Sequence, residues 1–225
     1  MTNTITNYLE KLSDDKVESP ENEINKPTIE KEQEIKGLTI IDKFITKEEH
    51  DKLLEAIKDQ DWDTTLSRRT QHYGYRYNYK SRNLNEKDKV EPLPEWSLKI
   101  CQKLIDAGHI SSLPDQLIVN EYKLGQGISA HIDSTTAFGD VIFSISLGAP
   151  CRMIFKRKSN SNIKKEFIVR PRTFMKMSGD SRYLYTHEIP KLSNASLTVY
   201  SERISLTFRY LLKKTKEDTS TEPTK

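Results

Sequence analysis

The feature that most constrains the fold is a succession of short strand-like runs in the C-terminal half of the chain. Runs rich in β-branched and aromatic residues lie between Leu117 and Leu212 and are separated by turn-forming residues. They occupy residues 117–122, 141–147, 151–157, 164–169, 173–177 and 203–212. Many short strands with regular turn signals indicate a β-sandwich or barrel. The sequence therefore predicts a jelly-roll core.

Two amphipathic segments precede this array. Thr46 and Glu49 form a capping box, in which each side chain satisfies a backbone N–H, and the helix that begins there is expected to run to about Gln60. A second helix is expected over 95–107, with Gly108 ending it. Helices followed by an array of strands predict an α+β domain, with the N-terminal helices packed on the jelly roll.

The folded domain is expected to span residues 37–212. Residues 1–36 hold nine acidic residues, five lysines and few large apolar groups, so we expect a disordered acidic leader that cannot offset its ordering entropy. Residues 213–225 read as a flexible tail for the same reason. The net charge of +3 for the whole chain conceals +6 in residues 37–211. That charge favours a polyanionic partner, although a lysine-rich surface explains it equally well.

Cysteine usage and hydropathy bear on the compartment. The two cysteines, Cys101 and Cys151, are far apart and outside any CxxC motif, which fits a reducing environment. No apolar run approaches membrane-spanning length, and the first residues lack the apolar region of a secretory signal. We therefore expect a cytoplasmic or nuclear protein with no membrane partner.

Three residues could form a metal site. In a strand or at its edge, the side chains of His131 and Asp133 point to the same face. His187 follows 54 residues beyond Asp133 and could reach them from another strand. Two histidines and one carboxylate form the facial triad that binds non-haem Fe(II) and leaves open coordination positions. A lone His-x-Asp is nevertheless common by chance, and His187 alone could be a strand-end histidine bonded to backbone.

The last strand-like run alternates without interruption. Arg203, Ser205, Thr207 and Arg209 share one face of residues 203–209, and apolar residues occupy the other. One reading is an ordinary strand whose polar side faces water. The other is a buried cationic strip, since arginine binds carboxylates in bidentate geometry and keeps its charge. A dicarboxylate such as 2-oxoglutarate requires anchors of this kind.

Taken together, these motifs resemble the AlkB family of 2-oxoglutarate/Fe(II) dioxygenases. The resemblance runs from about residue 66 to residue 211 and rests on motifs in the family's order and spacing. The motifs are Asn120-Glu-Tyr122, His131-Ile-Asp133, His187 and Arg203-x5-Arg209. The resemblance implies a double-stranded β-helix that uses Fe(II), 2-oxoglutarate and O₂. It also implies that Arg203 and Tyr122 hold the distal carboxylate of 2-oxoglutarate, with Asn120 and Arg209 near its iron-chelating end.

Within the family, the sequence looks most similar to the tRNA wobble-uridine hydroxylase branch, the eighth AlkB homologue. Residues 68–79, 114–148 and 177–189 carry that similarity. This branch is expected to hydroxylate the side chain of a modified uridine in RNA. Repair-type relatives resemble one another in having an acidic residue just after His-x-Asp, whereas here Ser-Thr-Thr-Ala-Phe follows Asp133 and the next acid is Asp140. Repair of cationic methylated bases is accordingly the less favoured alternative.

An aromatic and basic segment at 62–82 matches the nucleotide-recognition lid of the family. Interleaved rings and arginines suit nucleic acid, because rings stack on bases and arginines bind phosphates. The candidate substrate-binding residues are Arg68, Arg69, His72, Tyr73, Tyr75 and Arg76. Alternatively, about half of the tyrosines simply pack on the sheet.

Three functions remain open on the sequence alone. The first is an RNA-modifying hydroxylase acting on tRNA or single-stranded RNA, and the second is an oxidative demethylase of alkylated DNA or RNA bases. Both would couple decarboxylation of 2-oxoglutarate to hydroxylation of a substrate C–H bond. The third is a catalytically silent jelly-roll binding module, against which the intact set of candidate ligands counts.

Overall fold

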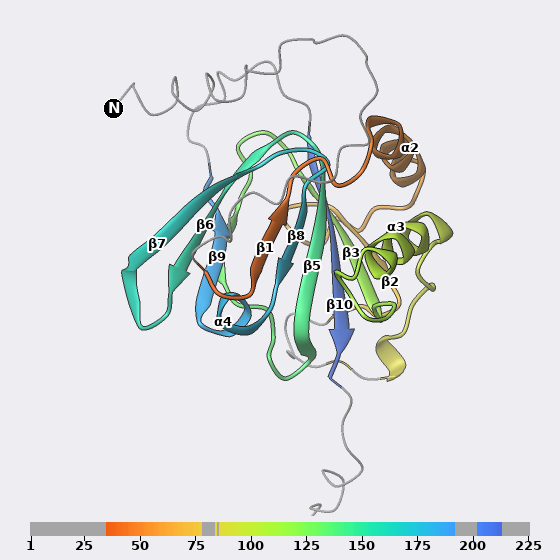
Figure 1. Cartoon of the computed structure of the whole chain (residues 1–225). Coiled ribbons are helices and arrows are strands. Elements are labelled where there is room, and N and C mark those ends of the chain that lie inside the picture. Colours follow the sequence, from red (N-terminus) through yellow and green to blue (C-terminus); the bar gives the residue numbers. More distant parts are fainter. Residues whose placement is uncertain (1–34, 78–83, 85, 192–201, 213–225) are drawn as a thin grey trace, which may run out of the picture.

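Two antiparallel sheets form the core of the protein, in a computed structural model that describes residues 35–77, 84, 86–191 and 202–212. The larger sheet has the strand order β1 (Leu38–Ile41), β8 (Phe174–Met177), β5 (Phe138–Gly148), β10 (Arg203–Leu211), β3 (Gln116–Tyr122) and β2 (Thr70–Tyr73). The smaller sheet has the order β4 (Ile128–His131), β9 (Tyr185–Ile189), β6 (Cys151–Arg157) and β7 (Asn160–Val169) (Figure 1). Neighbours far apart in sequence, such as β3 and β10, pair directly, which confirms the jelly-roll class.

The two predicted helices cover one face of the larger sheet (Figure 1). α2 (Lys47–Lys58) begins at the predicted capping box, in which the Thr46 hydroxyl accepts from the Glu49 N–H and a Glu49 carboxylate oxygen accepts from the Thr46 N–H. α3 (Glu95–Asp106) ends just before Gly108, which adopts a positive φ of 73°. Apolar side chains from both helices pack against the apolar side of β10 and its neighbours. The predicted α+β architecture is confirmed.

The opposite face of the larger sheet is turned toward the smaller sheet. A second apolar cluster joins residues of both sheets, including Ile142 and Met175 from the larger and Met153 and Phe155 from the smaller. This face also carries the polar residues of β10: Arg203, Ser205 and Arg209 are only 5%, 6% and 8% exposed. The reading of 203–209 as a strand whose polar side faces water is therefore excluded. These groups lie between the sheets.

The strand β2 emerges from a segment in which the sequence showed no clear period. β2 pairs with β3, with Thr70 opposite Asn120 and His72 opposite Ile118. The first three residues of β2 are all polar, so polar side chains occupy both faces of the strand. Hydrophobic periodicity therefore could not reveal it. The short elements β4, β9 and α4 (Gly179–Tyr183) were also missing from the predicted array.

Two residues of the predicted leader contact the described domain. Most of the expected leader (1–36) and the whole expected tail (213–225) lie outside the described residues, but Ile35 is 2% exposed and belongs to the second apolar cluster. The Lys36 carbonyl accepts from the Ser181 N–H at 3.0 Å. Ile35 and Lys36, which the sequence assigned to the leader, therefore contact the described domain. A single buried isoleucine gives no signal within an otherwise polar run.

Among the described residues, no helix is long and apolar enough to cross a membrane.

Ile35 gives a direct test of this boundary. Ile35→Ala should lower the free energy of unfolding by about 2–5 kcal/mol, because it removes a buried side chain and leaves a space that packing fills only in part. Ile163→Ala is the matched control, since Ile163 is 41% exposed, and should cost far less. Urea denaturation of the two variants measures the difference. Equal losses would mean that the domain does not begin at Ile35.

Candidate metal centre and cosubstrate site

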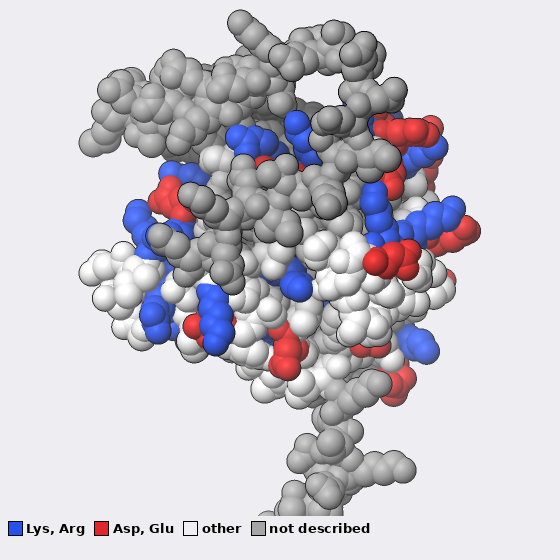
Figure 2. Space-filling view, viewed as in Figure 1, with Lys and Arg blue, Asp and Glu red and all other residues white. Residues whose placement is uncertain are grey.

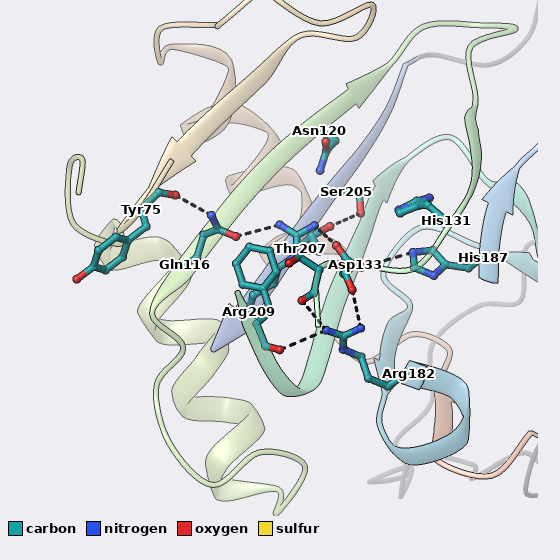
Figure 3. Close-up of polar contacts among 12 residues, drawn as sticks. Tyr75, Gln116, Asn120, His131, Asp133, Arg182, His187, Ser205, Thr207 and Arg209 are labelled. Atoms are coloured by element: carbon teal, nitrogen blue, oxygen red, sulfur yellow. Dashed lines mark hydrogen bonds and ion pairs between the residues drawn. The ribbon is translucent and has the colours of Figure 1, made fainter. Parts of the chain in front are cut away.

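The three predicted metal ligands converge between the sheets. His131 is the last residue of β4, Asp133 follows two residues later, and His187 lies in the middle of β9. β4 and β9 are paired so that His131 lies directly opposite His187, with ring centroids 4.3 Å apart. One possible ligand atom from each of the three residues lies within 4.8 Å of the others (Figure 3). Cross-strand pairing thus brings together residues more than 50 positions apart.

The register of β4 against β9 depends on a glycine. A Cβ atom at Gly127 would lie 2.1 Å from the backbone carbonyl oxygen of Ile189, a distance no side chain tolerates. Gly127 therefore allows the chain to approach β9 closely just before β4 begins, and His131 reaches His187 from there.

The histidine rings are oriented for ligation. Nδ1 of His131 lies 2.8 Å from the carbonyl oxygen of Ser129, which can only accept, so Nδ1 carries the proton and Nε2 is left for a metal. Burial lowers the pKa of His187 to about 4, although the nearby Asp133 carboxylate works in the opposite direction. His187 is neutral at pH 7 for that reason, and a neutral imidazole is the form that binds metal.

Asp133 is held as a carboxylate by its neighbours. Burial alone would raise its pKa, but the positive charge of Arg209, with smaller contributions from His187 and His131, outweighs burial and holds the pKa well below its ordinary value. A guanidinium nitrogen of Arg209 donates to Oδ1 of Asp133 at 2.7 Å, while Oδ2 lies 3.7 Å from Nε2 of His187. One oxygen of Asp133 is thus anchored by Arg209, and the other is directed toward His187. Two imidazoles and one carboxylate fit the donor set preferred by non-haem Fe(II).

Sequence reasoning missed Arg182, which fastens the loop that carries Asp133. Its side chain comes from α4, is 2% exposed, and donates to the backbone carbonyl oxygens of Asp133 and Ser134 at 2.9 and 3.0 Å. It also donates to the carbonyl oxygen of Gly139 at 3.3 Å. The backbone of the metal loop is thereby fixed from outside the triad. An arginine five residues before a candidate histidine ligand is a weak signal in sequence, because nothing there shows that it is buried.

The predicted 2-oxoglutarate residues share the same face of the larger sheet. Arg203 lies opposite Tyr122 in the β3–β10 pair, and its guanidinium carbon is 5.3 Å from the Tyr122 ring centroid. Within the described part of the chain, the buried Nε of Arg203 and the buried Oγ of Ser146 have no hydrogen-bond partner. Ser146 and Arg203 both flank Ser205, so the two unsatisfied groups are neighbours. Buried polar atoms of this kind are costly to leave unmatched, and a bound carboxylate would satisfy both.

Asn120 lies on this face as well and is contacted by the lid. The Nε of Arg68 donates to Oδ1 of Asn120 at 2.8 Å, and the Arg68 guanidinium lies 5.8 Å from the Tyr122 ring centroid. All four predicted cosubstrate residues, Asn120, Tyr122, Arg203 and Arg209, therefore lie on one face of strands β3 and β10, and Arg209 contacts the triad residue Asp133.

The lid residues divide between the two faces of the sheet. Arg68 and His72 lie on the side of the metal, and the pKa of His72 is lowered to about 4, first by burial and then by the charge of Arg76, so its ring is neutral at pH 7. Arg69 and Tyr73 lie on the side of the helices. Arg69 pairs with the buried Glu121 and stacks 4.4 Å from the Trp62 ring centroid.

The structure thus places Arg69 and Tyr73, two of the predicted substrate-binding residues, on the face opposite the triad. Tyr73 packs edge-to-face on Trp96 of α3, and its hydroxyl donates to Gln71 at 3.1 Å. Tyr73 thus packs on the fold, as the alternative reading allowed for about half of the tyrosines, and Arg69 pairs with a buried glutamate. Successive side chains of a strand point to opposite faces, so the neighbours of Arg68 and His72 point toward the helices.

Tyr75 and Arg76 lie at the rim rather than over the metal. The Tyr75 hydroxyl lies 3.3 Å from a carboxylate oxygen of Glu86. The Arg76 side chain is 55% exposed, and its guanidinium lies 3.2 Å from a carboxylate oxygen of Asp63. Beyond Tyr77, residues 78–82 of the predicted lid lie outside the described part of the chain.

Comparison with known proteins identifies the family. The sequence profile of the 2OG-Fe(II) oxygenase superfamily matches residues 37–209, the same region that carries the triad and the arginine strand. The chain belongs to this superfamily. This oxygenase therefore uses Fe(II) and 2-oxoglutarate, and the buried donors described above fit both.

Sequence relatives place the oxygenase among AlkB-like proteins. It is 36% identical over 207 residues to the Alkylated DNA repair protein ALKBH8 homolog of Arabidopsis thaliana, an alignment covering 80% of this chain and 60% of that protein. It is 40% identical over 162 residues to the Mus musculus tRNA (carboxymethyluridine(34)-5-O)-methyltransferase ALKBH8, covering 68% of this chain and 24% of that protein. The oxygenase thus corresponds to part of each of these relatives.

A solved structure supports the fold. OsALKBH1 superimposes with a TM-score of 0.61 at 18% identity, over 77% of this chain and 96% of that one. Similarity at this identity bears on the fold alone, and it confirms the AlkB-like jelly roll.

When bound, Fe(II) and 2-oxoglutarate supply the oxidising chemistry, in which O₂ is consumed, 2-oxoglutarate becomes succinate and CO₂, and one oxygen atom enters a substrate C–H bond. His131, Asp133 and His187 would hold the metal, and the Arg209 guanidinium keeps the Asp133 carboxylate ionised.

Arg203 is expected to determine affinity for 2-oxoglutarate. Arg203→Ala should raise the KM for 2-oxoglutarate about 10- to 100-fold, as expected for a lost hydrogen bond to a charged group. Arg203→Lys should recover little, because a point charge cannot reproduce the planar fork. Succinate formation at varied 2-oxoglutarate measures this. Arg152→Ala on the smaller sheet is the control, and an unchanged KM in Arg203→Ala would remove Arg203 from the site.

The adjacent pair Arg68 and Arg69 tests the division of the lid. Arg69→Gln should lower the free energy of unfolding by about 1–3 kcal/mol, because Glu121 is left buried without its partner. Arg68→Gln should change stability less and instead impair turnover, since Arg68 contacts Asn120 beside the metal. Thermal unfolding and succinate assays on both variants separate the two effects. The opposite pattern would contradict the assigned faces.

Proposed function

We propose that this oxygenase hydroxylates a modified uridine in RNA, with the wobble position of tRNA as the favoured site. In this proposal Arg203 and Tyr122 hold the distal carboxylate of 2-oxoglutarate, while Asn120 and Arg209 lie near its chelating end. Arg68 and His72 face the substrate from the lid. The main support is the similarity to the two ALKBH8 proteins over the region that contains the site.

The loop after the metal carboxylate favours a neutral base. Residues 134–139 contain no acidic side chain, and the first acid beyond them, Asp140, accepts a hydrogen bond from the Tyr183 hydroxyl. A cationic base such as 1-methyladenine would gain from a carboxylate at this position. Uridine derivatives are neutral at the base and need none. The neutral ring of His72 suits hydrogen bonding to such a base.

Charge favours nucleic acid, but without a dominant patch. Residues 37–211 carry +6, yet on the face in Figure 2 lysines and arginines are interspersed with acidic residues. Phosphate neutralisation would therefore be distributed over several contacts. An exposed base in a loop matches this arrangement better than an extended duplex, because an enzyme that modifies a base must capture it outside the stack.

A second candidate function is oxidative demethylation of alkylated bases. The observation in its favour is the name of the Arabidopsis thaliana relative, an alkylated DNA repair protein. Both functions need the same triad, so the difference lies in the fate of the hydroxylated carbon. A hydroxyl on an N-linked methyl group is lost as formaldehyde, whereas a hydroxyl on a C-linked side chain stays.

One experiment distinguishes the two. The purified protein is given Fe(II), 2-oxoglutarate and either an anticodon stem-loop carrying a 5-carboxymethyl-ester uridine at the wobble position or DNA carrying 1-methyladenine. The expected result is a gain of one oxygen atom on the uridine by nucleoside mass spectrometry, with little formaldehyde from the DNA. Asp133→Ala is the inactive control. Formaldehyde release from the DNA with an unchanged stem-loop would overturn the proposal in favour of repair.

A further inference from the structure

Gln116 connects the lid to the metal centre. It is the first residue of β3, is 1% exposed, and lies between the backbone of Tyr75 and the side chain of Arg209 (Figure 3). Its Nε2 donates to the Tyr75 carbonyl oxygen at 2.8 Å. Its Oε1 accepts from one guanidinium nitrogen of Arg209 at 3.0 Å.

Arg209 continues this connection to the metal ligand. The guanidinium nitrogen that does not contact Gln116 donates to Oδ1 of Asp133 at 2.7 Å. Two hydrogen bonds on one rigid, planar group couple the position of Gln116 to that of Asp133. The series Tyr75, Gln116, Arg209 and Asp133 is therefore continuous from lid to triad, and its two middle members, Gln116 and Arg209, are buried.

A series of aromatic contacts also connects the lid to Arg209. The Arg209 guanidinium carbon lies 4.9 Å from the Phe138 ring centroid, and the Tyr77 ring is 5.2 Å from that of Phe138. Tyr75 is thus connected to Arg209 through the side-chain amide of Gln116, and Tyr77 is connected to it through the ring of Phe138. The segment 74–77 has other attachments, such as the Arg76 N–H to the Asp88 carbonyl oxygen at 2.8 Å, but these lead away from the metal.

Glutamine is the residue type this position requires. A backbone carbonyl can only accept and a guanidinium can only donate, so the bridging side chain must offer one donor and one acceptor. Glutamate would keep the contact to Arg209 but lose the donor, and leucine would lose both.

We propose that Gln116 is a positioning residue that couples the order of lid segment 74–77 to occupancy of the metal site. A metal that fixes Asp133 fixes Arg209, and through Gln116 it fixes the Tyr75 backbone. Coupling is reciprocal by thermodynamic necessity, so ordering of the lid must strengthen metal binding by the same factor. This coupling depends on the Fe(II) site and not on the identity of the substrate.

Gln71 provides a matched control on the neighbouring strand. It is 3% exposed, and its Nε2 donates at 2.8 Å to a backbone carbonyl, that of Ile57 at the end of α2. Gln71 therefore shares the chemistry and burial of Gln116 but lies on the face of the helices. Gln71→Leu reports the general effect of losing a buried amide bridge.

The test is hydrogen exchange in the full chain, compared with and without Mn(II) and 2-oxoglutarate under argon, where no turnover occurs. In the wild type and in Gln71→Leu, exchange of peptides containing residues 74–77 should slow about fivefold or more on metal binding, the lower end of typical coupling. In Gln116→Leu that slowing should be lost, and the affinity for Mn(II) measured by calorimetry should fall by a similar factor. Gln116→Glu, which keeps the Arg209 contact, should also lose the slowing and serves if the leucine variant does not fold.

Two outcomes would overturn the coupling. One is full metal-dependent slowing in both Gln116 variants, and the other is equal loss in Gln71→Leu, which would indicate general loosening. The measurement contains no nucleic acid, so its failure leaves the proposed RNA substrate untouched, and an inactive stem-loop assay leaves the coupling untouched.

Discussion

The buried ion pair between Arg209 and Asp133 is the interaction on which the rest of the site depends. Without the guanidinium, burial would favour a protonated Asp133, and a neutral carboxyl is a poor metal ligand. The pair also explains why Arg209 can be buried at all, since an isolated charge between two sheets would be strongly destabilising. Because the guanidinium is a planar fork, Arg209 can donate one hydrogen bond to Asp133 and another to Gln116.

The position of this pair follows from the alternation of β10. Ile204, Leu206 and Phe208 face the helices and complete an apolar core, so Arg203 and Arg209 must face the smaller sheet. A one-residue slip of β10 would bury both arginines under the helices and expose the apolar residues to the metal. The stability of the helix-covered core therefore enforces the geometry of the site. In the described part of the chain, Nε of Arg203 and Oγ of Ser146 on the polar face have no hydrogen-bond partner, a cost that a bound carboxylate would remove.

Much of this could be predicted from sequence because it follows from short periods. The array of strands, both helices, the triad and the arginine strip depend on alternation, capping and spacing, and the structure agrees with them. Ile35, Arg182 and Gln116 could not be found in this way. Their importance comes from burial and from contacts between residues 41 to 145 positions apart, such as the Tyr75 carbonyl for Gln116 and the Ser181 N–H for the carbonyl of Lys36, next to Ile35. Pairwise tertiary contacts of that kind leave no periodic trace in the chain.

The composition of the lid does not reveal which of its residues face the metal site, because part of the lid forms a strand. Arg68 and Arg69 are equivalent in any count of basic residues, yet one contacts Asn120 beside the metal and the other pairs with the buried Glu121 under the helices. The same alternation separates His72 from Tyr73. An aromatic and basic segment therefore need not offer all its rings and charges to a ligand, because half of them build the edge of the sheet that holds the rest. The side chains that remain on the metal side are few and mostly neutral or paired, and under the proposed function such a surface would suit a single captured base better than a long stretch of phosphates.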